Sequence, residues 1–235
     1  MITEEINRRV IALWEDKYPN SEDVEDVWMP LVYPPLQEEG ILFIGLNPSF
    51  SDRGFRTILT DTPYASISPR EFFQWRNRSE FDMTTAIAIE SVAKKKYRFF
   101  AKFRDISNNL EVPWEHVDLF FNRMTSQNEF KSIILQNDKI NKFGGQQLEL
   151  SMMLIKAVRP QIIVVANALA AQILQKELDL KFDEELGCHV VVLNAQPVPV
   201  FLASMLTGQR AMDTYSYQRL KLHIRRVHDR AIKRK

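Results

Sequence analysis

A neutral amide follows a fully apolar stretch near the start of the chain. Residues 41–44 are Ile-Leu-Phe-Ile, and Gly45, Leu46, Asn47 and Pro48 come next. Four apolar residues between two glycines predict a short strand buried on both faces, as in a parallel sheet. Because Gly45 permits unusual backbone angles and Pro48 cannot continue a ladder, we expect Asn47 at the carboxyl end of this strand. Ligands bind at that edge of open α/β sheets, although Gly-x-Asn-Pro can also be a simple turn.

A second polar group follows another apolar run. Residues 116–121 (His-Val-Asp-Leu-Phe-Phe) predict a strand, and Asn122-Arg123-Met124-Thr125 follow it directly. The carboxamide of Asn122 offers a paired donor and acceptor that could recognise a polar ring edge. The alternative is an amide that satisfies backbone groups where the strand ends.

Basic and aromatic residues alternate further upstream. Such alternation can hold phosphates and stack bases. The alternative, which the composition favours, is a core-facing aromatic stripe with a solvated basic face. The basic residues are Lys94, Lys95, Lys96, Arg98, Lys102 and Arg104, and the aromatic ones are Tyr97, Phe99, Phe100 and Phe103.

The elements that would position these groups alternate between helix and strand. This alternation predicts an α/β fold with a parallel sheet. Of the apolar runs 190–193 and 200–202, separated by two prolines, we expect one to be a central strand and the other an edge or an approach to it. Helices are expected over 3–19, 83–110, 148–158, 168–178 and 215–232. The first is capped by Thr3, and 83–110 forms one or two helices. A further strand is expected over 162–165.

The last of these helices is amphipathic. Its apolar face carries Leu220, Ile224, Val227 and Ala231. The cationic residues on its other faces, like the basic run 94–104, could follow a nucleic-acid backbone. Those cationic residues are Arg219, Lys221, Arg225, Arg226, Arg230 and Arg234.

Two stretches show no clear period. Residues 21–39 are acidic and proline-rich, which predicts an irregular crossing into the first strand. Residues 51–82 mix glycine and proline with six aromatic residues. This second stretch is either a lid over the strand end or an inserted packing element with a short helix over 69–75.

Composition limits the class of protein. A chain of 235 residues, 45% hydrophobic and 26% charged, predicts a soluble protein with one sizeable core. The net charge of +1 is too small for a polycation, so nucleic-acid binding would need local patches. One cysteine, Cys188, excludes an internal disulfide and a cluster built from several thiolates. The four histidines lack metal-ligand spacing, so we expect no metal. No apolar run long enough to cross a bilayer and no secretory signal is visible, so we expect a cytoplasmic location.

Three stretches, in this order, resemble the uracil-DNA glycosylase superfamily, nearest to its mismatch-specific uracil/thymine branch. Residues 45–49 (Gly-Leu-Asn-Pro-Ser) are similar to that branch's strand-end motif Gly-Ile-Asn-Pro-Gly. Residues 119–125 (Leu-Phe-Phe-Asn-Arg-Met-Thr) are similar to its strand leading into an Asn and a later Arg-Thr pair. Residues 201–210 occupy the place of its Pro-Ser loop before the last helix. The resemblance spans roughly residues 40–232, with 51–96 as an insertion.

The resemblance implies a fold and an activity. The fold is a three-layer α/β/α sandwich around a central, mostly parallel four-stranded sheet, as a single domain over 1–235. The activity is hydrolysis of the N-glycosidic bond of uracil, or of another damaged or mismatched base, in double- or single-stranded DNA. The resemblance implies no cofactor, and we expect a monomer.

It also implies roles for individual residues. Asn47 would orient the attacking water as the catalytic residue, and because an amide is a poor base the enzyme would be slow. Asp52 is the nearest acid, and an aromatic from the insertion could replace Phe50 in stacking on the base. Base-binding roles fall to Gly45, Leu46, Pro48, Ser49, Phe50 and Asn122. Contacts to DNA fall to Ser204 on a phosphate, Met205 or Leu206 as a wedge, and Gly208 and Arg210 in the same loop.

The chain also departs from the family pattern. Ser49 replaces the second glycine of the motif, Ala203 stands where relatives carry Pro, and the loop after it has no histidine. These departures favour a competing hypothesis, a protein of the same fold that binds nucleic acid or a nucleotide without cleavage. A third hypothesis, an enzyme acting on free nucleosides or nucleotides, follows if the insertion closes over the site.

Overall fold

The computed structural model describes residues 1–19, 27–208 and 210–233. The chain forms two compact units, and each is assembled from three separate segments. The first unit consists of Met1–Pro35, Asn47–Arg98 and Asp118–Leu154, and the second of Leu36–Leu46, Phe99–Val117 and Ile155–Lys235.

The second unit contains the central sheet. In the described part of the chain this sheet has six strands, in the order β2-β1-β5-β8-β7-β6. β5 pairs in parallel with both β1 and β8, whereas β7 pairs antiparallel with β8 and with β6. The bounds are Ile41–Gly45 for β1, Trp114–Asp118 for β2, Ile162–Val165 for β5, Lys181–Asp183 for β6, Cys188–Leu193 for β7 and Gln196–Leu202 for β8.

The α/β class and the mostly parallel central sheet are confirmed, but the expected number of four strands is wrong. Strands β2, β1, β5 and β8 account for four, and β7 and β6 extend the sheet beyond β8. Of the two apolar runs after residue 189, β8 is central, as expected for one of them. The other, β7, is not the edge, because the short strand β6 lies outside it, but it leads into β8 and pairs with it, as expected for an approach to the central strand.

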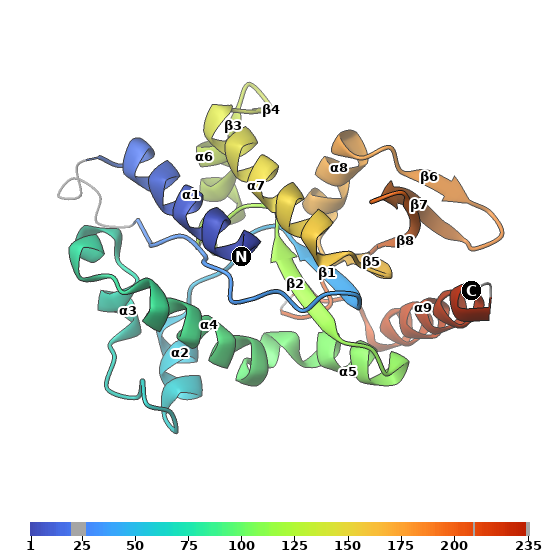
Figure 1. The fold of residues 1–235 in the computed structure, drawn as a ribbon, viewed down its shortest axis with the longest axis horizontal. Coiled ribbons are helices and arrows are strands. Elements are labelled where there is room, and N and C mark those ends of the chain that lie inside the picture. Colours follow the sequence, from blue (N-terminus) through green and yellow to red (C-terminus); the bar gives the residue numbers. More distant parts are fainter. Residues whose placement is uncertain (20–26, 209, 234–235) are drawn as a thin grey trace. The chain divides into compact units, whose positions relative to one another are not determined.

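Helices cover both faces of this sheet. Ile41 and Phe43 of β1 pack with residues of α5 (Ala101–Leu110) and α9 (Thr214–Lys233) in one apolar cluster. The Phe43 and Phe103 rings stack at 4.3 Å. Figure 1 shows α5 and α9 on one side of the sheet and α8 (Ala168–Glu177) on the other.

The first unit is mainly helical. Its helices are α1 (Ile2–Lys17), α2 (Asp52–Leu59), α3 (Pro69–Phe72), η2 (Trp75–Glu80), α4 (Met83–Lys96), α6 (Gln127–Ile134) and most of α7 (Lys142–Val158). A small hairpin of β3 (Leu135–Gln136) and β4 (Lys139–Ile140) joins α6 to α7, and η3 (Arg98–Phe100) joins α4 to α5.

Several helix predictions are confirmed with shifted ends. Residues 83–110 do form two helices, α4 and α5, and α8 ends one residue before its predicted end. α1 is capped by Met1 instead of Thr3, and α7 begins six residues earlier than expected. In α9, Ile224 and Val227 are buried as expected. The side chain of Ala231, the whole of Arg234, and residues 20–26 of the predicted irregular crossing lie outside the described part of the chain.

Helix α2 was not expected. The stretch 51–82 has no clear period, yet Ser51 begins a helix by accepting a hydrogen bond from the Gly54 amide at 3.1 Å. Phe55 and Leu59 then bury one face of α2. The short helix of the predicted packing element is present as α3 and ends at Phe72 instead of Trp75, and the alternative of a lid over the strand end stays a prediction.

The second strand is also displaced. β2 ends at Asp118, so residues 119–121 are not part of the ladder although all three are buried. The Phe121 amide donates to Gln147 Oε1 at 2.8 Å, and its carbonyl accepts from the Leu31 amide at 2.9 Å. Partners on a helix and on an irregular segment thus replace the neighbouring strand.

Two prolines are accommodated inside β8. Pro197 and Pro199 lie in the half of the strand that pairs with β7 alone, and pairing with β5 begins at Val200. Proline cannot donate to a ladder, so its place is where one side of the strand is unpaired. In the described residues, no helix is long and apolar enough to cross a membrane.

Candidate active site

The Asn47 side chain joins the two polar segments that the sequence analysis singled out. Its Nδ2 donates to the carbonyl oxygens of Pro48 at 3.1 Å, Asn122 at 3.1 Å and Met124 at 2.7 Å. The Met124 amide returns a bond to the Pro48 carbonyl at 2.9 Å. Residues 47–48 and 122–124 are therefore held together in the first unit.

This arrangement fixes the orientation of the amide. Three carbonyl oxygens surround one end of the Asn47 carboxamide, so that end must be the NH2 group. Oδ1 then faces away from them, and it accepts no hydrogen bond from any described residue. Asn47 is only half-buried. It can therefore present a fixed acceptor to a ligand or a water molecule.

Asn122 carries a second unused acceptor. Its side chain is 6% exposed, and Oδ1 is buried without a partner among the described residues. Leaving a buried polar atom unpaired costs about 1–3 kcal/mol, which a bound donor would remove. The alternative that Asn122 only satisfies the backbone does not account for this oxygen.

Arg123 is part of the scaffold. Its guanidinium forms an ion pair with Glu90 of α4, its Nε donates to the Met29 carbonyl at 3.1 Å, and it lies 4.4 Å from the centre of the Phe73 ring. The Arg123 and Glu90 side chains are 1% and 11% exposed. A cation so enclosed cannot reach a phosphate. It instead ties the residue after Asn122 to α4 and to the segment at Met29.

Asp118 was not predicted as a site residue. It is the last residue of β2, it is 4% exposed, and its amide donates to Tyr33 Oη at 2.8 Å. Burial raises the pKa of Asp118 to about 8, with Arg123 lowering it and Glu90 raising it. The only signal in the sequence is an acid inside a mostly apolar run, and one of its two charged neighbours, Glu90, comes from a distant helix.

Phe50 is one ring of an aromatic column made of Trp28, Phe50, Phe55 and Tyr97. Phe50 stacks on Trp28 at 4.2 Å and on Phe55 at 5.7 Å, and Phe55 stacks on Tyr97 at 6.4 Å. Because two rings already stack on Phe50, a base could stack there only by displacing one of them. The expected stacking role thus does not fit Phe50 in this arrangement.

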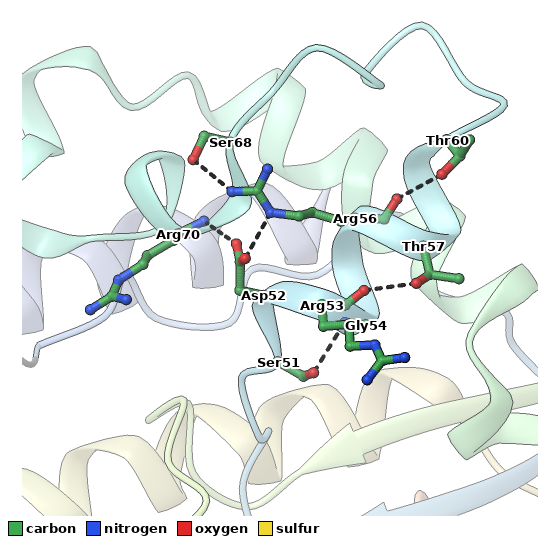
Figure 2. Close-up of polar contacts among 9 residues, drawn as sticks. All are labelled: Ser51, Asp52, Arg53, Gly54, Arg56, Thr57, Thr60, Ser68 and Arg70. Atoms are coloured by element: carbon green, nitrogen blue, oxygen red, sulfur yellow. Dashed lines mark hydrogen bonds and ion pairs between the residues drawn. The ribbon is translucent and has the colours of Figure 1, made fainter.

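Asp52, the nearest acid in the sequence, serves the scaffold. Figure 2 shows its carboxylate between two partners, with Oδ2 accepting from Arg56 Nε at 2.7 Å and Oδ1 accepting from the Arg70 amide at 3.0 Å. Arg56 also reaches Ser68 Oγ at 3.4 Å. Asp52 therefore links the first turn of α2 to the start of α3 and is occupied as an acceptor.

Other predicted residues lie in both units. In the first, Pro48 is part of the segment that Asn47 binds, and Ser49 is exposed. In the second, Gly45 ends β1 and Leu46 is 5% exposed. Ser204 and Arg210 belong to the second unit too, and both are exposed. A meeting of Ser204 and Asn47 in one cleft stays a prediction.

Leu206 does not fit the role of a wedge. It is 1% exposed and belongs to the apolar cluster that packs α5 and α9 on the sheet. Met205 is partly exposed, and its carbonyl accepts from the Met212 amide at 2.9 Å, which closes the loop. Gly208 has φ +91°, a backbone conformation that glycine adopts easily. Of the two predicted wedges, only Met205 is accessible.

The aromatic and basic residues of the run 94–104 lie in different surroundings. Phe99, Phe100 and Phe103 all pack into the apolar cluster of the second unit, as the core-facing alternative predicted. Lys95 and Lys96 at the end of α4 are exposed. The aromatic half of this run is therefore core, and stacking on a base would need rings elsewhere.

No metal centre is found in the described part of the chain, where no three His, Cys, Asp or Glu side chains gather. Cys188 is buried and free, and burial with the nearby Asp183 raises the pKa of its thiol to about 11. A thiol of this kind is a poor nucleophile at neutral pH.

No protein-family model matches the chain, and no curated protein matches its sequence.

Proposed function

We propose that this protein is a DNA N-glycosylase of the uracil-DNA glycosylase type. It would hydrolyse the bond between deoxyribose and uracil, or another damaged or mismatched base, without a cofactor or metal and as a monomer. The observation that carries the proposal is the Asn47 carboxamide, whose NH2 end is fixed by three carbonyl oxygens while Oδ1 accepts from no described residue.

The resemblance and the fold support the same proposal. Asn47 follows β1 by two residues and Asn122 follows β2 by four, and the two segments are bonded to each other. An α/β sheet with ligand groups after its strands is what the glycosylase fold would require. The finer assignment, a three-layer glycosylase sandwich with a hairpin added at one edge, is part of this proposal.

Each residue would contribute through hydrogen bonds. Asn47 Oδ1 would accept from the attacking water and direct its oxygen at the anomeric carbon of a flipped nucleotide. The Asn122 carboxamide would pair with the edge of the extruded base, which would satisfy its buried oxygen. Because an amide takes up a proton poorly, the rate would be modest.

Base release tests the proposal. Duplex and single-stranded oligonucleotides carrying uracil, mismatched thymine or oxidised and alkylated bases are incubated with the protein, and abasic sites are cleaved by alkali and counted. We expect release from at least one substrate, and a fall of about 100-fold or more in Asn47→Ala. Asn122→Ala should weaken discrimination between bases.

The matched control is Asn128→Ala, which removes an exposed amide on α6. It should keep the full rate. Circular dichroism of each variant separates lost chemistry from lost folding, because Asn47 also holds the backbone. An Asn47→Ala protein that is folded and fully active would refute the assignment of Asn47.

A second candidate function is binding of nucleic acid without cleavage. It is favoured by the Ser49 side chain in the motif and by the burial of Leu206, which removes one of two predicted wedges. Oligonucleotide binding by the intact protein, with no base released from any substrate, would support this candidate and refute the first.

A further inference from the structure

The aromatic column ends in a ring that is available to a ligand. Trp28 is partly exposed, and among the described residues the ring partner of its indole is Phe50 alone. Its Nε1 donates to no described residue and is not one of the buried unpaired atoms. Because this N–H is not buried, it is open to a partner from solution, such as an acceptor atom of a ligand.

The backbone holds this tryptophan firmly. The Trp28 carbonyl accepts from Trp14 Nε1 at 3.0 Å, and Trp28 forms a β-bridge with Gln74. The Met29 amide donates to the Phe73 carbonyl at 2.7 Å, and the Met29 carbonyl accepts from Arg123. Ordering the backbone of this residue for binding therefore costs little conformational entropy.

The same contacts place Trp28 in the neighbourhood of the candidate active site. Arg123 binds the backbone next to Trp28, and its chain neighbours Asn122 and Met124 accept hydrogen bonds from Asn47. Phe50, the ring on which Trp28 stacks, lies three residues after Asn47. Segments 27–29, 47–50 and 122–124 thus interlock within the first unit.

We propose that Trp28 is the stacking platform for a nucleobase at this site, in place of Phe50. A base would lie on the indole face opposite Phe50 and extend the column by one ring, while Nε1–H donates to a carbonyl of the base or to a phosphate. Base-on-aromatic stacking contributes about 1–3 kcal/mol and tolerates any base. The proposal rests on the proposed function only in assuming that the ligand carries a nucleobase.

Intrinsic fluorescence can report this contact selectively. Of the four tryptophans, Trp14 and Trp75 are 1% and 0% exposed, and their Nε1 atoms donate to backbone carbonyls. Trp114 packs against Phe43 and Phe100 in the second unit. Trp28 is therefore the indole that a stacked base should quench.

The experiment titrates the full chain with an oligothymidylate of about 16 nucleotides and with a fully abasic oligonucleotide of the same length. We expect quenching by the oligothymidylate only, at one fixed salt concentration because phosphate contacts depend on salt. Trp28→Leu should abolish the quenching and weaken binding roughly 5- to 150-fold, and Trp28→Phe should restore part of the affinity. Trp114→Phe is the matched control and should keep both.

The outcomes separate this proposal from the catalytic one. Quenching that depends on Trp28, together with no base release from any substrate, supports the platform and refutes cleavage. Base release with an unchanged affinity and rate in Trp28→Leu supports cleavage and overturns the platform. Equal quenching by the abasic oligonucleotide, or no binding of either oligonucleotide, also overturns it.

Discussion

The two ends of the Asn47 carboxamide have different surroundings, and this difference can be tested by a change of one atom. In Asn47→Asp an oxygen replaces the NH2 group and faces the carbonyls of Pro48, Asn122 and Met124. A carboxylate is repelled by such oxygens, and protonation would relieve the repulsion.

We therefore expect Asn47→Asp to lower the free energy of unfolding by about 1–3 kcal/mol at neutral pH. The deficit should be smaller near pH 4, where the carboxyl is neutral, and should grow as pH rises. Urea denaturation at several pH values measures it. Asn128→Asp on the exposed face of α6 should stay within about 0.5 kcal/mol of the unchanged protein.

Asp118 should make the stability of the protein depend on pH. Burial raises its pKa to about 8 in the folded chain, against about 3.9 in the unfolded chain. Between these values the folded state holds a proton that the unfolded state has lost. The free energy of unfolding therefore falls as pH rises through this range, by up to about 1.4 kcal/mol per pH unit.

Asp118→Asn should remove this slope. Urea midpoints measured from pH 5 to pH 8 should fall for the unchanged protein and vary less for the variant, whereas Asp61→Asn, on an exposed turn, should behave like the unchanged protein. Parallel curves for all three proteins would contradict the assignment of a neutral Asp118.

At this scale the sequence indicates some site residues and misses others for a physical reason. Asn47 and Asn122 stand out because each follows an apolar run, and their segments do meet. Asp118 and Glu90 become candidates only through Arg123, which forms an ion pair with Glu90, 33 residues away in the sequence. Local patterns carry no information about such a partner.

Among the elements, the loop after β8 shows how burial decides between two adjacent residues. Leu206 lies in the apolar cluster of the second unit, and Met205 is partly exposed. Leu206→Ala should cost about 2–5 kcal/mol of unfolding free energy, and Met205→Ala markedly less. Thermal and urea denaturation of both variants measure the difference, and equal losses would show that the loop is not anchored through Leu206.

Element positions follow from sequence where a period is strong. β5 agrees with its prediction at both ends, because Ile-Ile-Val-Val is a continuous β-branched run that follows Pro160-Gln161 and is closed by Ala166-Asn167. α2 and the end of β2 do not agree with their predictions. α2 lies in a stretch without a clear period, and the Phe121 amide donates to Gln147, 26 residues along the chain, instead of to a neighbouring strand. β6 has only three residues and no signal of its own.

At the scale of the whole molecule, the two units are interleaved along the chain. β1 belongs to the second unit and Asn47, two residues later, to the first. The sequence shows no linker or change of composition at such a crossing, so it predicts the α/β class but not this division.

Interleaving predicts that neither unit can be released by one cut. The fragment 1–98 lacks the segment 118–154, which supplies Phe121 and Arg123 to its core, and the fragment 155–235 lacks β1, the parallel neighbour of β5. Both should give far-ultraviolet spectra and amide dispersion of unfolded chains. Cooperative thermal unfolding of either fragment would contradict this expectation.

The outermost strand β6 also affects how the protein behaves at high concentration. An unpaired strand edge can template the addition of another chain, and long apolar edges do so most readily. β6 offers three residues, of which Lys181 and Asp183 are charged. Few backbone groups and two charges leave little for an incoming strand to pair with, so we expect this end of the sheet to add a further strand poorly, even though Phe182 is exposed.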